Sequence, residues 1–157
     1  MRSSLQISVL FVLFVLAGCA AAPAPAAGTA AAIDRAAAEA DIAEAVFRYQ
    51  FDHNASALQK KAETYCLSLP GERMPAAELL GRFAGNRPPV LAADQCERKS
   101  RKSLFFRVQR YDWRKDDEVW VRGGYWEANL SSSLEMYRVV NKNGKWTVTG
   151  ARMEALS

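Results

Sequence analysis

The feature that most constrains this chain is an apolar run close to its start, which ends at a cysteine. Residues 5–18 carry no charge and follow a short segment that contains Arg2. The run is about as long as the apolar part of a secretory signal, whereas a membrane-spanning helix needs roughly 20 apolar residues. We therefore expect residues 1–18 to be an export signal, so that the rest of the chain builds the fold.

The residues before Cys19 resemble the lipobox of bacterial lipoproteins. Leu16, Ala17 and Gly18 precede the cysteine, after a charged start and an apolar run in the right order. The resemblance implies that the Cys19 thiol receives a diacylglyceryl group, that a peptidase cuts before it, and that the new amino terminus is acylated. Two or three acyl chains make an essentially permanent anchor. The alternatives are an ordinary secretory signal with a chance cysteine, or an uncleaved anchor.

A lipid anchor restricts the location and the partners of the protein. The resemblance implies the bacterial cell envelope, with the outer membrane, facing the periplasm, as the expected site. Loss of Arg2 with the signal lowers the net charge from +4 to +3, a mild excess that does not indicate nucleic acid. The expected partners are the membrane, through the lipid, and an envelope or secreted protein; no cofactor is expected.

The remaining chain divides into a tether and one domain. Residues 20–32 are mostly alanine, with two prolines and no charge, and this composition is typical of a spacer. Residues 19–32 are thus the lipidated cysteine and its tether. Residues 33–157 are enough for one domain with a real core and too few for two.

Two cysteines remain once Cys19 is assigned to lipid, and we predict that they form a disulfide. Export places Cys66 and Cys96 in an oxidising compartment, where such pairs usually close. Because Cys96 follows Cys66 by 30 positions, the bridge would contribute about 3.6 kcal/mol. The alternatives are two unrelated buried thiols or a metal site. The metal site is disfavoured because two cysteines and the lone His53 do not make a zinc spacing.

The spacing of apolar residues predicts an α+β domain. Helical periodicity begins at residue 33 and ends near residues 52–54,. A strand over residues 64–69 and a shorter helix over residues 74–85 follow, then a loop or short edge strand over residues 88–96. The last four predicted strands, joined by short connections into an antiparallel meander, are residues 104–113, 118–128, 134–140 and 145–153,.

Alternation in these strands predicts a sheet with one face packed on the amino-terminal helix. In the second strand of the meander, Val119 and Val121 share a face opposite Trp120 and Trp126. The clearest turn is residues 141–144, which contains Asn-Gly and therefore tolerates positive φ.

The element order and the closing hairpin, YRVVNKNGKWTV at residues 137–148, resemble the NTF2-like, cystatin-related α+β superfamily. The resemblance implies a curved antiparallel sheet around a long helix, often with a conical pocket at one end. In some NTF2-like enzymes a histidine and an aspartate in the cone act as acid and base, which makes Asp52 and His53 the candidate pair. Adjacent residues at a helix end point in different directions, and no third group orients them. We favour a capping or surface histidine and predict no catalytic residue.

Three further motifs have structural interpretations. The acidic residues at 112 and 116–118 lack the order of a calcium loop, so a solvated turn is favoured. Gly123 and Gly124 follow no phosphate-loop pattern and predict a β-bulge or sheet bend. The basic segment at residues 98–102 would suit an anionic lipid or an acidic partner, although a solvated loop is the favoured interpretation.

The most suggestive pattern combines aromatic rings with arginines. Phe105, Arg107, Tyr111 and Trp113 are expected on one side of the first meander strand, and Trp120, Arg122 and Trp126 on one side of the next. If both sets face the same way they form one stripe, in which the candidate binding surface is Arg107, Tyr111, Trp113, Trp120, Arg122 and Trp126. Such residues are enriched at binding hot spots, although core packing with snorkelling arginines is the competing and favoured interpretation. The sequence therefore predicts a non-catalytic envelope lipoprotein that binds a protein, as an accessory or as an inhibitor or immunity-type protein. The alternative is an NTF2-like small-molecule binder or enzyme.

Overall fold

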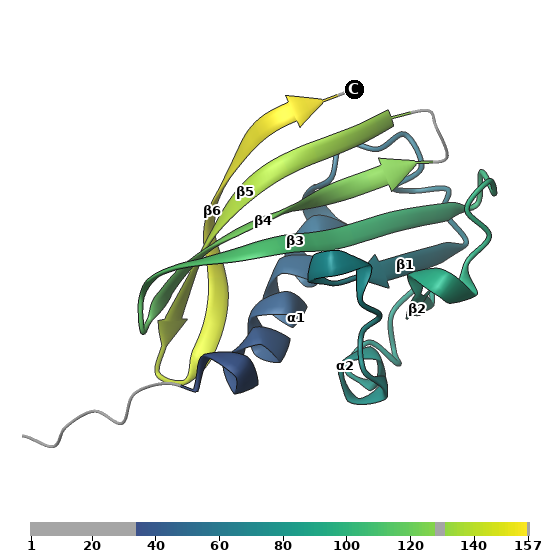
Figure 1. Ribbon diagram of the computed structural model, residues 1–157. Helices are drawn as coiled ribbons and strands as arrows, with labels where there is room; N and C mark the ends of the chain where they lie inside the picture. Colours follow the sequence, from purple (N-terminus) through teal and green to yellow (C-terminus); the bar gives the residue numbers. More distant parts are fainter. Residues whose placement is uncertain (1–33, 128–130, 157) are drawn as a thin grey trace, which may run out of the picture. The chain divides into compact units, whose positions relative to one another are not determined.

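Helix α1 (Arg35–His53) packs against one face of a six-stranded sheet (Figure 1). The structure, a computed structural model, describes residues 34–127 and 131–156. The predicted signal and tether lie outside these residues. The strands and short helices are β1 (Thr64–Ser68), η1 (Pro70–Glu72), α2 (Ala77–Gly81), β2 (Val90–Ala92), η2 (Ala93–Gln95), β3 (Ser103–Lys115), β4 (Glu118–Glu127), β5 (Ser131–Lys142) and β6 (Lys145–Leu156).

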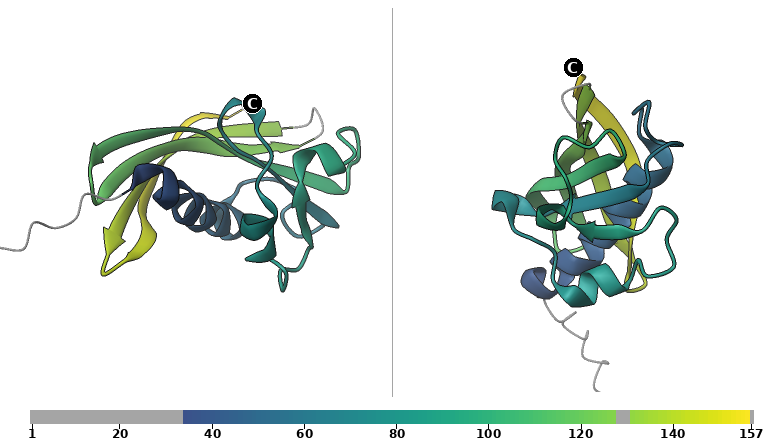
Figure 2. Two further views of the ribbon diagram at one scale, coloured as in Figure 1. Left: turned by 60° about the horizontal axis from the view of Figure 1, so that its bottom comes forward. Right: turned by 90° about the vertical axis from the view of Figure 1, so that its right-hand side faces the viewer.

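Helix α1 matches the helix that the sequence predicts. Asp34 caps it, because its carboxylate accepts hydrogen bonds from the backbone N–H groups of Ala36 and Ala37, at 3.0 and 3.3 Å,. One side of the helix is buried, including Ile42 and Phe47. The sheet bends over this side, so that α1 lies in its concavity (Figure 2).

The sheet is mixed, where a wholly antiparallel sheet was expected. Its strand order is β2-β1-β3-β4-β5-β6, and β1 runs parallel to both β2 and β3. The connections that carry η1 and α2, and then η2, are long enough to return the chain to the same end of the sheet, which parallel pairing requires. The four-stranded meander from β3 to β6 is antiparallel, as predicted.

The second helix is shorter than the sequence predicts. It covers residues Ala77–Gly81 only, because the residue before a proline avoids the helical region, which keeps the chain extended around Pro75. After Gly81 the chain tightens into turns, in which Phe83 N–H donates to Leu80 and Ala84 N–H to Gly81. Leu79 and Phe83 still reach the core on the same side of the sheet as α1.

A β-bulge interrupts β3 and changes which side chains face the helix. Val108 pairs with Gly123 and Arg110 with Arg122, so Gln109 is the additional residue on β3. Before the bulge, even-numbered residues of β3 face α1; beyond it, odd-numbered residues do, because one inserted residue reverses the alternation. Gly123 and Gly124 thus lie opposite a β-bulge, and the bulge predicted at this pair is confirmed.

Two apolar clusters lie on opposite faces of the sheet. The main core joins α1 and α2 to the concave face and contains Val119 and Val121, as expected. A smaller cluster on the other face contains Cys66, Ala93 and Phe105, with Met74, Cys96 and Trp126 packed against it. The face opposite α1 is therefore covered near β1 and β3.

Candidate functional site

The structure divides the predicted aromatic and basic residues between the two faces of the sheet. Arg107, Trp120, Arg122 and Trp126 lie on the face opposite the helices, which we call the outer face. Tyr111 and Trp113 instead pack against the main core. Their placement corrects the expectation of one shared side, and the reason is the bulge at Gln109.

The contacts of Tyr111 and Trp113 confirm that they face the helix. The Tyr111 hydroxyl donates to the backbone carbonyl of Glu39 in α1, at 3.4 Å, and burial raises the pKa of this phenol. The Trp113 ring meets the buried Trp146 ring edge to face, with centroids 5.6 Å apart, and the Arg35 guanidinium lies over it. Both side chains therefore belong to the core rather than to a binding surface.

Helix α1 fixes the bulge through one buried amide. Gln50 Nε2 donates to the Arg107 carbonyl and to the Tyr137 hydroxyl, each at 3.3 Å. A Cβ at Gly123 would overlap that carbonyl oxygen. The glutamine, the bulge and the glycine therefore act as one unit, which sets the outward direction of Arg107.

The outer face carries an excess of positive charge among the described residues. Arg110 pairs with Asp112 at 2.8 Å, Arg122 with Glu154 at 3.0 Å, and Arg138 with Glu118 at 2.6 Å. The Arg138 guanidinium lowers the pKa of Glu118. The arginines of this face outnumber these three acids. They are Arg107, Arg110, Arg122, Arg138 and Arg152.

A pocket of about 430 Å³ opens at the end of the outer face where β1 stops. Its lining comes from the loop after β1, from η2 and the loop after it, and from β3 and β4. The residues that line it include Ser68, Leu69, Gly71, Glu72, Met74, Ala93, Arg98, Phe105, Arg107, Gln109 and Trp126. We call it the Arg107 pocket.

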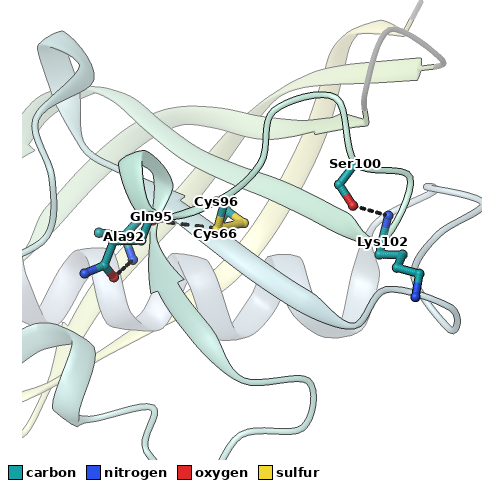
Figure 3. Close-up of a disulfide and its surroundings, with 6 residues drawn as sticks. All are labelled: Cys66, Ala92, Gln95, Cys96, Ser100 and Lys102. Carbon is teal, nitrogen blue, oxygen red and sulfur yellow. Dashed lines mark hydrogen bonds between the residues drawn. A yellow bond between two sulfur atoms is a disulfide. The ribbon is translucent and has the colours of Figure 1, made fainter.

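The disulfide holds one wall of this pocket against the sheet. Figure 3 shows the bond that joins Cys66 to Cys96. Cys66 in β1 is bonded to Cys96, which directly follows η2, with their Cα atoms 6.3 Å apart. The bond agrees with the pairing expected from the sequence. Ala93, a residue of η2, is buried in the same cluster as Cys66. The bridge therefore fixes η2 beside the apolar end of the outer face.

Arg107 stands apart from the other arginines of the outer face. Its guanidinium makes no ion pair with any described residue, and its Nε is buried with no described acceptor. Buried donors in proteins are almost always paired, and an unpaired one is costly. Arg107 is therefore the group of the outer face that is best suited to receive an anion.

Polar side chains fill the space between the carboxyl-terminal part of α1 and the sheet. Besides the bonds of Gln50, the Ser133 hydroxyl donates to Glu135 at 3.0 Å, and Ser56 donates to the carboxylate of Glu127 at 2.5 Å. Burial raises the pKa of the Tyr137 hydroxyl. Each of these side chains makes a hydrogen bond to a neighbour, although Gln50 Oε1 is buried without a described partner. None of them lines the Arg107 pocket.

Asp52 and His53 lie on the surface at the end of α1. His53 stacks on Tyr49, with ring centroids 4.2 Å apart, and its Nδ1 donates to the Tyr49 carbonyl at 3.0 Å. Neither residue lines the Arg107 pocket or a second pocket of about 350 Å³ beside α1 and the β5–β6 hairpin. This environment is that of a capping histidine.

The other motifs have the structural roles favoured above. Asp116 pairs with Arg35 at 3.1 Å in an exposed turn, and Asn143 and Gly144 both have positive φ in the β5–β6 turn. Lys102 in the basic segment pairs with Glu63 at 2.8 Å. Arg98 of that segment lines the Arg107 pocket, a position that the favoured interpretation as a solvated loop did not predict.

Sequence reasoning also missed Glu72 and Met74, which line the Arg107 pocket. The available signal was the position of Cys66. Cys66 in β1 pairs with Phe105 in the neighbouring strand β3. A disulfide at Cys66 therefore implies that another segment of the chain covers the outer face. The loop that provides the cover has no sequence pattern of its own.

The comparisons leave the site to be interpreted from its geometry. Within residues 34–127 and 131–156, no group of three or more potential metal ligands comes together. In the same part of the chain, none of the helices has the length and apolarity needed to cross a membrane. No family model matches the chain, no curated protein is significantly similar to it, and no solved structure matches it.

Proposed function

We propose that this protein is an envelope lipoprotein whose domain binds another protein through the outer face of its sheet. The observation that carries the proposal is the set of partly exposed Trp120, Arg122 and Trp126 on the face opposite α1 and α2. Tryptophan and arginine contribute large areas and polar handles, which makes them common anchors of interfaces.

The charge of the outer face indicates the kind of partner. Arginines exceed acids on this face, while four of them already have carboxylate neighbours. A complementary partner would present acidic groups around an apolar patch, and the charges would accelerate association at low salt. An accessory protein, an inhibitor or an immunity-type protein would act in this way, held near the membrane by Cys19.

A capture experiment with the tagged, lipid-anchored protein tests the proposal. We expect the unaltered protein to retain an envelope or secreted protein. The Trp120→Ala, Arg122→Ala double variant should capture at least about tenfold less of this partner, as expected for hot-spot residues. Capture should also weaken when the salt concentration rises, because exposed charges are screened.

The matched control for this experiment is Arg87→Ala. Arg87 is exposed on a loop and donates only to its neighbour's carbonyl at 2.9 Å, so its loss should leave capture unchanged. Equal retention by the double variant and by this control would contradict a role for the outer face.

The alternative proposal is an NTF2-like small-molecule binder or enzyme. The curved sheet over one helix supports an NTF2-like or cystatin-like assignment of the fold. The hydrogen-bonded side chains of Gln50, Tyr137, Ser133 and Glu135 occupy the region where a cone would open, and this disfavours a site at Asp52 and His53.

A further inference from the structure

The Arg107 pocket has a rigid frame that is independent of the exposed middle of the outer face. β1 ends at Ser68, which pairs with Arg107, so β3 continues beyond this point without β1 beside it. The chain then closes a tight loop, in which Leu69 N–H donates to the Arg73 carbonyl at 2.8 Å. The disulfide fixes the opposite wall through η2.

Glu72 gives this loop an unusual backbone. Its φ is 57° and that of Gly71 is 71°, both in the left-handed region. A non-glycine residue in this region is uncommon and is found where the structure around it enforces the conformation, often at ligand-binding sites. Because Glu72 lines the pocket, its left-handed backbone helps to shape the pocket wall.

The floor of the pocket is apolar. The rings of Phe105 and Trp126 meet with centroids 4.9 Å apart, and Met74 and Ala93 belong to the same cluster. All four residues line the pocket. Its volume of about 430 Å³ lies within the range of small-molecule sites, so the floor can accept a ring or a short aliphatic body.

The charged groups of the lining favour a single negative charge. Arg98 and Arg107 contribute two positive charges and Glu72 one negative charge, so the lining as a whole favours a monoanion over a dianion. Arg107 has no carboxylate partner among the described residues, in contrast to the arginines beside it. A planar guanidinium pairs best with a planar carboxylate, through two parallel hydrogen bonds.

We propose that the Arg107 pocket binds a small monocarboxylate with an apolar body, whose carboxylate pairs with Arg107 and whose body lies on Phe105 and Trp126. The pocket shares Trp126 with the proposed protein-binding surface, but Trp120 and Arg122, the two residues changed in the capture experiment, do not line it. Either proposal can therefore fail without the other.

Fluorine NMR tests this site on the full lipid-anchored protein in phospholipid nanodiscs, with empty nanodiscs as the blank. The probe is a trifluoromethyl-substituted phenylacetate, and the comparison compound is its primary amide, which has the same shape without the charge. We expect the carboxylate to bind at least about tenfold more tightly than the amide, because a charge-assisted pair replaces a neutral contact.

Two variants of the lining should change the affinity for the carboxylate in opposite directions. Arg107→Gln should weaken it about tenfold or more. Glu72→Gln should strengthen it about twofold to fivefold, since it removes a like charge from the wall. The matched control is Arg110→Gln, because Arg110 is an exposed arginine on the same strand that pairs with Asp112 and does not line the pocket.

Several outcomes would overturn the proposal. Equal binding of the acid and the amide would show an apolar pocket without anion selectivity. Equal losses in the two arginine variants would assign the effect to general surface charge. Displacement of the probe by inorganic phosphate at a lower concentration than by unlabelled phenylacetate would contradict the carboxylate assignment. Failure of the probe to bind at all would disprove the proposed binding site.

Discussion

At the scale of single residues, Gly123 shows how closely the site and the fold depend on each other. A Cβ there would overlap the carbonyl oxygen of Arg107 and approach Gln50 Nε2 to 3.0 Å. The carbonyl cannot move away without losing its hydrogen bond from Gln50, at 3.3 Å. We therefore expect Gly123→Ala to lower the free energy of unfolding by about 1–3 kcal/mol, the usual cost of overpacking, measured as a lower urea midpoint.

Gly150→Ala is the control for this prediction. Gly150 also lies in a strand of the sheet, but no atom lies within 4 Å of the position of its Cβ. Its substitution should change the free energy of unfolding by less than about 0.5 kcal/mol. Similar losses in the two variants would mean that the loss in Gly123→Ala does not come from overlap with the Arg107 carbonyl at the bulge.

At the scale of elements, the alternation of apolar residues predicted which side chains of β4 face the helix. In β3, the residue inserted at Gln109 made the same prediction fail. In β4 the pattern correctly separated Val119 and Val121 from Trp120 and Trp126. In β3 the same reasoning was wrong beyond Gln109, because a bulge leaves no mark in the local pattern and is set by contacts with other elements. The glycine pair signalled a bulge without showing on which strand it lies.

The parallel strands and the pocket loop depend on contacts between distant segments. β2 has only three residues, Val90–Ala92, and lies at the edge of the sheet. Its place beside β1 depends on the disulfide and on packing of the segment between them, so a short apolar run does not predict its direction. The residues of the Arg107 pocket come from four segments, namely the loop after β1, η2 with the loop after it, β3 and β4, which is why only part of the site could be predicted.

Removal of the disulfide should loosen this end of the sheet. In the Cys66→Ala, Cys96→Ala double variant we expect the free energy of unfolding to fall by about 3.6 kcal/mol, from the entropy of the released loop. Hydrogen exchange should accelerate first in residues 93–103, because the bridge ties this segment to β1. The hairpin of β5 and β6 is the internal control, and its protection should change least.

A result in which β5 and β6 lose protection as early as residues 93–103 would contradict a local role for the bridge. Unchanged stability in denaturant would contradict the loop-entropy argument itself. Because Cys66 and Ala93 are buried together, the alanine variants also remove some packing, so the loss should exceed that caused by reduction alone.

At the scale of the whole molecule, the two faces of the sheet have different roles. Helices α1 and α2 cover the concave face and complete the main core. The other face carries the small cluster, the Arg107 pocket and the tryptophans around Arg122. If residues 20–32 form the proposed tether of a lipid-anchored protein, they would let this second face reach partners at a distance from the membrane.

The three cysteines make the proposed organisation of the whole molecule measurable. In protein purified from membranes, we expect a mass that corresponds to an acylated chain beginning at Cys19, because the lipobox resemblance implies cleavage before this residue. Alkylation without reductant should label no cysteine, since Cys19 would carry lipid through its sulfur and Cys66 is bonded to Cys96. After reduction, the two disulfide cysteines should react and Cys19 should not.

The variant Cys19→Ser separates the anchor from the fold. It should not be lipidated, yet the Cys66–Cys96 bond should still form once the domain reaches an oxidising compartment. Its thiol count after reduction should therefore equal that of the unaltered protein. A reactive Cys19 in an unmodified, soluble chain would disprove the anchor, whereas free thiols at Cys66 and Cys96 in the unaltered protein would disprove the bridge. The two results are independent because the proposed lipid would attach outside the domain, whereas the bridge lies within it.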